Sequence, residues 1–215
     1  MILAVDTSGK TASASVSENG VLLGYRMLYT ARSHSQILLP MVKDLLAETG
    51  HTVQDVDTFA VAVGPGSYTG LRIGIAAMQA MAYAGQKNCV GVSTLEGLAW
   101  NLCGTKGLLC ACLTARQNLC YCAFFESDGQ RVTRRTDDKV MPVEEIAAQI
   151  AAYGETVTVI GDGISLLRPI CEAAVPAPMH LCNQSACGIC MAAAEKETCT
   201  PEELVVNYLQ EVKIG

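Results

Sequence analysis

The chain has 215 residues, half of them hydrophobic, with 15 basic against 21 acidic side chains. This length and apolar content suit one large globular domain or two small ones. The formal net charge of −6 argues against tight nucleic-acid binding by this chain alone. The first residues lack a basic region, and no apolar run reaches the length of a membrane span, so we expect a cytosolic protein without a membrane segment.

The sequence contains eleven cysteines and no secretion signal. We interpret them as thiols, because the cytosol keeps cysteines reduced. Cys187 and Cys190 have the CxxC spacing of a metal or redox pair, but no second pair completes a zinc site. Buried or surface thiols are therefore the favoured interpretation. Four others alternate like residues on one face of a strand: Cys110, Cys112, Cys120 and Cys122.

The first half of the chain predicts three strands followed by alternating helices and strands. Asn19-Gly20 separates two apolar runs and indicates a hairpin. Residues 35–48 follow a helical period, with Pro40 expected in the first turn or at a kink. Ser93 and Glu96 fit a capping box at a helix start. The predicted strands are 2–6, 12–17, 21–29, 59–63 and 89–92, and the predicted helices are 35–48, 70–84 and one from residue 93.

The second half repeats this order of elements without repeating the sequence. Strands are predicted at 108–113, 119–125, 131–140 and 156–160, with a helix that begins at Pro142 and ends at Gly154. We therefore expect an α/β fold of two βββαβα, ribonuclease H-like halves, residues 1–105 and 106–215. Such a doubled fold resembles the actin, hexokinase and Hsp70 superfamily, in which nucleotide lies between the halves.

The most distinctive motif is the glycine segment Gly64-Pro65-Gly66-Ser67-Tyr68-Thr69-Gly70-Leu71-Arg72-Ile73-Gly74, between a predicted strand and a predicted helix. Such a junction gathers backbone N–H groups at the positive end of a helix dipole and suits a phosphate. It lacks the Lys of GxxxxGK[ST] and the third glycine of GxGxxG. We expect at most a vestigial nucleotide site, formed by Asp6, Thr7, Ser8, Gly64, Gly66, Ser67, Thr69 and Arg72.

Asp6-Thr7-Ser8 ends the first predicted strand, and two interpretations are open. In the superfamily the first hairpin binds phosphate, so Asp6 would face a hydrated metal; alternatively these residues cap a turn. One carboxylate makes a poor magnesium site, and the corresponding turn at Thr114 contains no acid. The three histidines have no metal-binding spacing and no GxSxG motif is present, so we expect no metal and no catalytic residues.

The predicted helix over 70–84 is apolar nearly all round, with Arg72 and Gln79 as its only strongly polar side chains. Such a helix needs cover on every side. It is either a central core helix or a helix whose small residues accept a partner helix. We favour the partner interface, because a two-layer domain has little to cover the outer face. Its residues would be His34, Leu38, Met41, Val42, Leu45, Gly70, Gly74, Ala77, Met81 and Ala84.

Four segments resemble the TsaB family, the bacterial scaffold proteins for threonylcarbamoyladenosine synthesis in tRNA. They are Ile2-Leu3-Ala4-Val5-Asp6-Thr7-Ser8, His34-Ser35-Gln36-Ile37-Leu38-Leu39-Pro40, the glycine segment, and Gly91-Val92-Ser93-Thr94-Leu95. The second half resembles the family less. Thr114 stands where the family tends to have Asp, Gln36 where it tends to have Glu, and Val206 and Gln210 where it tends to have Pro and Arg.

This resemblance implies a non-catalytic scaffold that pairs through the two helices with a catalytic, TsaD-like paralogue and stabilises it. With a TsaE-like ATPase subunit, the complex would transfer a threonylcarbamoyl group to the adenosine beside the anticodon. The resemblance implies a homodimer when the paralogue is absent, tRNA contact only through the complex, and ATP or ADP only in the complex. The alternative is an ATP-dependent kinase or peptidase of the same fold.

Overall fold

The computed structural model describes residues 1–30 and 32–209, so Gln210 lies outside the described residues. The described chain divides into two compact units. Unit 1 comprises Met1–Gly97 and Gln184–Asn207, and unit 2 is built on Leu98–Asn183. The predicted second half, residues 106–215, therefore differs from unit 2, because the segment Gln184–Asn207 belongs to unit 1.

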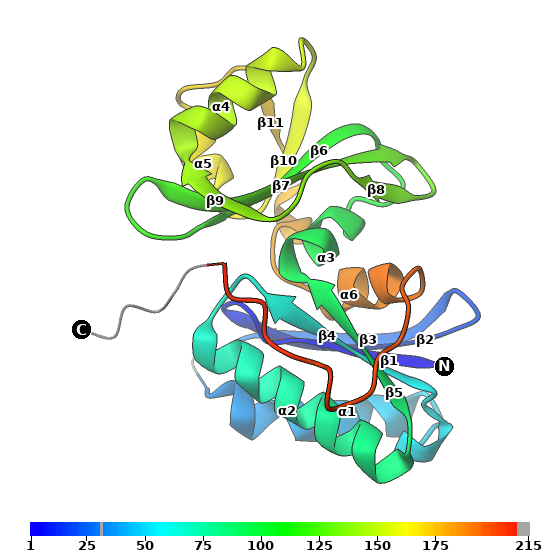
Figure 1. The fold of residues 1–215 in the computed structure, drawn as a ribbon. Coiled ribbons are helices and arrows are strands. Elements are labelled where there is room, and N and C mark those ends of the chain that lie inside the picture. The colour runs from blue at the N-terminus through cyan, green and yellow to red at the C-terminus, as the bar shows by residue number, and fades with distance from the viewer. Residues whose placement is uncertain (31, 210–215) are drawn as a thin grey trace. The chain divides into compact units, whose positions relative to one another are not determined.

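Unit 1 is built on a five-stranded sheet in the order β3-β2-β1-β4-β5 (Figure 1). Its antiparallel part consists of β1 (Ile2–Asp6), β2 (Thr11–Glu18) and β3 (Val21–Tyr29). Asn19 and Gly20 both adopt positive φ, as a tight Asn-Gly hairpin requires. The parallel strands β4 (Thr58–Gly64) and β5 (Asn88–Ser93) extend the sheet beyond β1.

Helices cover both faces of the unit 1 sheet (Figure 1). On one face lie α1 (His34–Glu48) and α2 (Tyr68–Gly85), and a short 3-10 helix, η1 (Val53–Asp55), follows α1. Pro40 lies in the second turn of α1, inside the helix and beyond the first turn. α3 (Thr94–Trp100) begins as the capping box predicts, because the Glu96 N–H bonds to Ser93 Oγ at 3.3 Å.

The other face of this sheet is covered by α6 (Ala186–Ala193), from the C-terminal segment. Ser13 Oγ accepts the Ala186 N–H at 2.9 Å, and Ser15 Oγ donates to the Ala186 carbonyl at 2.8 Å. Thr11 Oγ1 donates to the Gln184 carbonyl at 2.8 Å. Ser13 thus satisfies one of the first N–H groups of α6, which have no partner within the helix, and Thr11 and Ser15 hold the carbonyls beside it.

Unit 2 has a sheet in the order β11-β10-β6-β7-β8, and β9 also pairs with β7. The predicted strand at 131–140 is two short strands, β8 and β9. β6 pairs antiparallel with β7 and parallel with β10, as β1 pairs with β2 and β4. The strand bounds are β6 (Lys106–Thr114), β7 (Leu119–Asp128), β8 (Val132–Arg134), β9 (Lys139–Pro142), β10 (Val157–Ile160) and β11 (Ala174–Pro176).

Three short helices complete unit 2: α4 (Val143–Ala152), α5 (Ile164–Leu167) and the 3-10 helix η2 (Met179–Leu181). The shared strand order of the two units confirms the predicted doubled α/β fold. The eleven cysteines are free thiols, and the four alternating ones are buried in unit 2, as predicted. Within residues 1–30 and 32–209, no helix is long and apolar enough to cross a bilayer.

Candidate functional site

Asp6 lies at the end of β1 and is only 1% exposed. Its Oδ1 accepts two hydrogen bonds from Ser8, from the backbone N–H at 2.8 Å and from Oγ at 2.6 Å. Burial raises the pKa of Asp6 to about 6, and the two bonds from Ser8 partly oppose this rise. The carboxylate therefore caps its own turn, which favours the turn interpretation over a metal-facing carboxylate.

The glycine segment packs directly against this turn. The Ser67 N–H donates to the Ser8 carbonyl at 2.7 Å, and Thr7 Oγ1 donates to the Gly70 carbonyl at 2.7 Å. A Cβ at Gly66 would lie 2.5 Å from the Ser8 carbonyl oxygen, so this glycine is needed for the close approach. The glycine segment and the turn after β1 thus hold each other through direct backbone contacts.

The N-terminus of α2 also uses its polar groups internally. Ser67 caps the helix, because its Oγ accepts the Gly70 N–H at 3.2 Å, and its carbonyl accepts the Leu71 N–H at 2.9 Å. Arg72 is exposed and stacks over the Tyr68 ring, 4.0 Å from its centroid. The first-turn N–H groups that would bind a phosphate are therefore partly occupied.

The structure brings together only some of the predicted nucleotide residues. Asp6, Thr7, Ser8, Gly66 and Ser67 form one contact cluster. Thr69 and Arg72 are exposed. Gly64 instead faces the C-terminal segment: a Cβ there would lie 2.5 Å from the Asn207 carbonyl oxygen, and the Asn207 N–H bonds to the Val63 carbonyl at 2.8 Å.

Six residues expected at a partner interface belong instead to the interior of unit 1. They are Leu38, Met41, Val42 and Leu45 on α1, at most 4% exposed, and the buried Gly70 and Gly74 on α2. A Cβ at Gly74 would lie 2.6 Å from Thr7 Oγ1, so this part of α2 faces β1. The physical reason is that the apolar stripe of each helix packs on its own sheet, which leaves the opposite side for other contacts.

The C-terminal segment supplies cover that the sequence analysis assigned to a partner. Gln79 Nε2 donates to the carbonyls of Pro201 at 2.8 Å and Leu204 at 2.9 Å. Leu204 is 3% exposed and packs in the unit 1 core. Figure 1 shows this red segment running along α2. One flank of α2 is thus closed within the chain.

The remaining flank of α2 is exposed and carries a row of small side chains, with the large Tyr83, 72% exposed, beside them. Ala76, Ala80 and Ala84 are exposed, and Ala77 and Met81 are half-buried beside α1. Leu39, 53% exposed, continues this surface on α1, where the half-buried His34 is the first helical residue. We call the residues Leu39, Ala76, Ala77, Ala80, Met81 and Ala84 the α1–α2 face.

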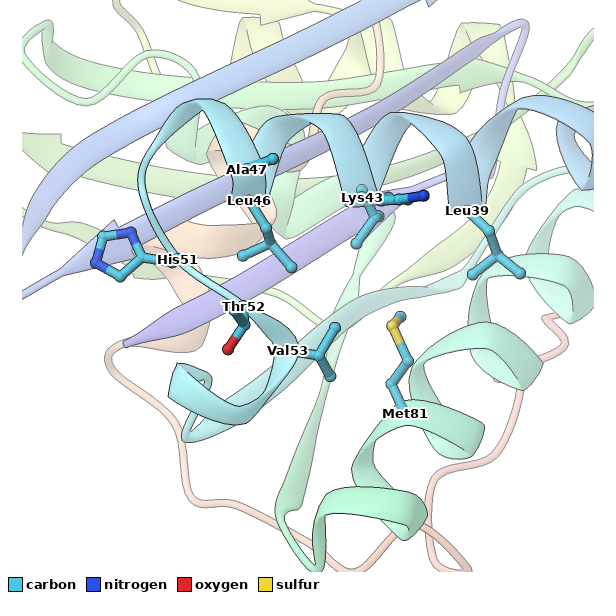
Figure 2. A pocket seen from close by; sticks show the side chains of 9 residues that line it. Leu39, Lys43, Leu46, Ala47, His51, Thr52, Val53 and Met81 are labelled. Atoms are coloured by element: carbon cyan, nitrogen blue, oxygen red, sulfur yellow. The ribbon is translucent and has the colours of Figure 1, made fainter.

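A cavity of about 310 Å³ opens beside the α1–α2 face. Figure 2 shows the side chains of Leu39, Val53 and Met81, which come from α1, η1 and α2 and line the same space. The other lining residues are Val42, Lys43, Leu46, Ala47, His51 and Thr52. Most of this lining is aliphatic, so the cavity suits an apolar side chain more than a charged ligand.

In unit 2, the turn after β10 carries a carboxylate that the sequence analysis did not assign to a site. Asp162 Oδ1 accepts the Thr114 N–H at 2.8 Å, and Oδ2 accepts Thr114 Oγ1 at 2.8 Å. The turn at Thr114 has no acid of its own, as noted from the sequence, but the Gly161-Asp162-Gly163 turn supplies one from the neighbouring strand. In the part of the chain that the structure describes, no group of three or more His, Cys, Asp or Glu is placed to hold a metal.

The family model described as TsaD, tRNA N6-adenosine threonylcarbamoyltransferase, matches residues 28–211. The tRNA threonylcarbamoyladenosine biosynthesis protein TsaB of Escherichia coli (strain K12) is 33% identical over 163 residues, which cover 74% of this chain and 70% of that protein. The protein of the same name from Bacillus subtilis (strain 168) is 26% identical over 216 residues, 97% of this chain and 93% of that protein.

Two solved structures are similar to this chain over most of its length. YeaZ from Pseudomonas aeruginosa has a TM-score of 0.84 at 28% identity and covers 97% of this chain and 99% of its own. The activator of the 2-hydroxyisocaproyl-CoA dehydratase from Clostridium difficile, with bound ADPNP, has a TM-score of 0.51 at 9% identity, with 90% and 94% coverage. At that identity the second likeness concerns the fold alone.

Proposed function

Since the chain belongs to the TsaB proteins, within the wider family that the TsaD model describes, we propose that it is a non-catalytic scaffold subunit for threonylcarbamoyladenosine synthesis in tRNA. In this role it pairs with a catalytic TsaD-type partner and stabilises it. The observation that carries the proposal is the α1–α2 face, where a row of exposed alanines on α2 lies beside the exposed Leu39 of α1 and the cavity that Leu39 and Met81 line.

The physical argument for this face is the close approach that alanine permits. The distance between packed helices depends on the side chains at the contact, so a row of Ala76, Ala80 and Ala84 lets another helix come near. An exposed helix flank without charged residues between Ala76 and Ala84 is also compatible with an interface core, where charged residues are depleted. The cavity lined by Leu39 and Met81 lies beside this row and can receive an apolar anchor side chain.

The geometry around Asp6 gives little support to chemistry by this chain alone. Its carboxylate is buried and bonded to Ser8, and the glycine segment contacts the turn directly. The alternative of a peptidase is not favoured, since relatives with good coverage are named as biosynthesis proteins. An ATP-dependent kinase would need a metal held near the phosphates, and a single capped carboxylate supports this poorly.

The remaining parts of the proposal concern the other partners. We infer that a TsaE-type ATPase subunit joins the complex, that ATP or ADP binds only there, and that tRNA is contacted through the complex. The net charge of −6 supports this division, because phosphate contacts require clustered Lys and Arg. Without its partner, the chain would associate with itself. The proposal places the protein in the cytoplasm, where tRNA is modified.

The test is a substitution that places charge on the α1–α2 face. Ala80→Glu adds a carboxylate to an exposed helical position, so the chain should fold normally but lose the TsaD-type partner. Ala148→Glu is the matched control, since Ala148 is also exposed and helical but lies on α4 of unit 2. Each variant is mixed with the partner from the same source and followed by size-exclusion chromatography, and the amount of threonylcarbamoyladenosine formed is then measured. Ala77→Glu, nearer to α1, should act in the same direction as Ala80→Glu.

We expect co-elution and product with the native chain and with Ala148→Glu, and neither with Ala80→Glu. Circular dichroism and urea unfolding of the isolated variants verify that the fold is retained. A normal complex with Ala80→Glu would refute the interface. The kinase alternative would be supported if the native chain alone turned over ATP, if Ala148→Glu kept this turnover and if Asp6→Ala abolished it.

A further inference from the structure

Cys89 and Cys199 lie opposite each other at one edge of the unit 1 sheet. Cys89 belongs to β5, which ends this sheet, and Cys199 belongs to the C-terminal segment. The Cys89 N–H donates to the Cys199 carbonyl at 2.8 Å, and the Cys199 N–H donates to the Cys89 carbonyl at 2.8 Å. Two residues that exchange both bonds form a directly opposed antiparallel pair, so their side chains lie on the same face.

The spacing of this pair is close to that of a disulfide. In a hydrogen-bonded antiparallel pair the Cα atoms lie about 5.5 Å apart, and disulfides most often join Cα atoms about 5.5–6 Å apart. The Cβ atoms of opposed residues lie about 4.5–5.5 Å apart, so a disulfide requires them to approach by about 1 Å. Cys199 forms an isolated bridge and not a full strand, so this approach disturbs few backbone bonds.

Contacts on either side of the pair hold it in register. Asn88 Nδ2 donates to Thr198 Oγ1 at 3.2 Å, over a separation of 110 residues. Further along the C-terminal segment, Gln79 Nε2 donates to the Leu204 carbonyl at 2.9 Å. Both cysteine side chains belong to or pack against the same unit 1 core cluster. The folded chain therefore keeps the two thiols together, although they are far apart in the sequence.

The two thiols differ in their access to solvent. Cys89 is buried, whereas Cys199 is half-buried, so a small molecule can reach one sulfur of the pair. Cys112 and Cys122 also lie opposite each other, on β6 and β7, but each is at most 2% exposed. Accessibility therefore separates the Cys89–Cys199 pair from these buried thiols of unit 2.

Both thiols of the pair are protonated at neutral pH. Burial raises the pKa of Cys89 to about 11, and the neighbouring Cys199 and Glu202 add to this rise. Burial also raises the pKa of Cys199, with Glu203 acting in the same direction. Because the thiolate is the form that attacks a disulfide, exchange at this pair is slow at neutral pH and becomes faster as the pH rises.

We propose that Cys89 and Cys199 are a site of thiol–disulfide exchange, at which a small disulfide of the glutathione class, R–S–S–R, links the C-terminal segment to β5. The Cys199 thiolate attacks one sulfur of R–S–S–R, and the R–S⁻ that leaves takes up the proton that Cys199 released. The Cys89 thiolate then attacks the Cys199 sulfur of the mixed disulfide, and a second R–SH leaves with the proton of Cys89. Two protein thiols are thus oxidised to one disulfide, and one small disulfide is reduced to two thiols.

The product would fix the C-terminal segment on the flank of α2 that it covers. A disulfide stabilises a chain mainly by restricting the unfolded state, and the effect grows with the length of the loop that it closes. Here Cys89 and Cys199 are as far apart in sequence as Asn88 and Thr198, 110 residues. In a reducing compartment the thiols predominate, so the bond would form when the pool of small thiols becomes oxidised.

The test equilibrates the folded full chain with oxidised and reduced glutathione at a series of ratios, at about pH 8.5 so that more thiolate is present. Free thiols are then alkylated, disulfides are located by mass spectrometry of unreduced peptides, and urea unfolding is measured. Cys199→Ser removes the accessible thiol, and Cys89→Ala removes the thiol of the second step. Cys187→Ser is the matched control, because Cys187 is also half-buried in unit 1 and lies near a second thiol, Cys190.

We expect a linked Cys89–Cys199 peptide pair in the native chain and in Cys187→Ser, with a urea midpoint about 1 M higher than that of the reduced chain. Cys199→Ser should show neither, and Cys89→Ala should carry one glutathione on Cys199. If Cys89→Ala does not fold, the comparison of Cys199→Ser with Cys187→Ser decides. Free Cys89 and Cys199 at the most oxidising ratio, a disulfide elsewhere as the main product, or a midpoint that does not rise would each overturn the proposal.

Discussion

The turn after β4 in unit 1 and the turn after β10 in unit 2 both donate a backbone N–H to the neighbouring first strand or the turn that follows it. In unit 1 the Ser67 N–H donates to the Ser8 carbonyl at 2.7 Å, beyond the end of β1. In unit 2 the Gly163 N–H donates to the Cys112 carbonyl at 3.0 Å, near the end of β6. Glycine permits both approaches, since a Cβ at Gly66 or Gly163 would meet these carbonyls or their neighbours.

The two turns differ in where they place a carboxylate. In unit 1 the acid is Asp6, on the strand, buried and bonded within its own turn. In unit 2 the acid is Asp162, on the glycine turn, exposed and bonded across to Thr114. The backbone contact is common to both units but the carboxylate position is not. The two glycine turns therefore share a role in the close packing of neighbouring strands. They do not share the arrangement of a ligand site.

The largest expected effect comes from the buried Asp6 carboxylate, because burial makes its charged form unfavourable in the folded chain. With a folded pKa of about 6 against an ordinary value of 3.8, the folded chain holds a proton between these values that the unfolded chain releases. The stability that Asp6 contributes is therefore present at low pH and is lost as the pH rises through about 6. Relative to Asp6→Asn, the native chain should lose about 3 kcal/mol of unfolding free energy between about pH 3 and pH 7.

The measurement is urea unfolding of both chains at several pH values, because the difference between them cancels the titration of other groups. Ser8→Ala sharpens the result: the Ser8 hydroxyl bond lowers the pKa of Asp6, so its removal should shift the loss to higher pH. Parallel curves for the native chain and Asp6→Asn would mean that the Asp6 carboxylate is not desolvated in the folded chain.

The next effect concerns the close approach of the unit 1 turn. A Cβ at Gly70 would overlap the Thr7 carbonyl oxygen, which is backbone and cannot rotate away. Gly70→Ala should therefore destabilise the chain by about 2 kcal/mol, since overpacking exceeds the helix propensity gained. Urea unfolding followed by circular dichroism measures the change.

Gly85→Ala is the control within the same helix, since its Cβ would meet only the flexible Lys87 side chain at 3.3 Å. It should be neutral or stabilising by up to about 1 kcal/mol. Equal effects of the two substitutions would contradict a role of close packing at Gly70, and the glycine segment would again require a ligand to explain it.

The local pattern of the sequence was enough to predict most strands of this fold. The bounds of β1 and β3 agree with the predicted 2–6 and 21–29, because apolar runs and the Asn19-Gly20 turn mark them locally. The helical period also located α1 and α2 to within two residues. Such signals depend on neighbours within a few positions, which is why they are visible without a structure.

Contacts between distant positions could not be predicted in this way. Thr11 bonds to the Gln184 carbonyl over a separation of 173 residues, and Gln79 bonds to Leu204 over 125. Without knowledge of these two hydrogen bonds, the spacing of apolar residues in α2 predicts an apolar helix but not which flank the C-terminal segment covers. The apolar stripe of α1 likewise does not show from sequence whether it faces a partner or its own sheet, and in the structure Leu38 and Leu45 fill the core of unit 1. Asp162 was missed because its partner, Thr114, lies 48 residues earlier.

The smallest expected effect tests the unit 2 side of the comparison. Thr114→Val keeps the shape of the side chain and the backbone bond to Asp162 but removes the Oγ1 donor. Since both residues are exposed, water can replace the lost bond, and we expect a loss of only about 0.5–1 kcal/mol. Thr133→Val, at an exposed position of β8, is the control and should change stability less. Urea unfolding followed by the fluorescence of Trp100, which lies in unit 2, measures both. A loss as large as that expected for Asp6 would mean that the Thr114–Asp162 pair is shielded from water, and the two turns would then differ in sequence position alone.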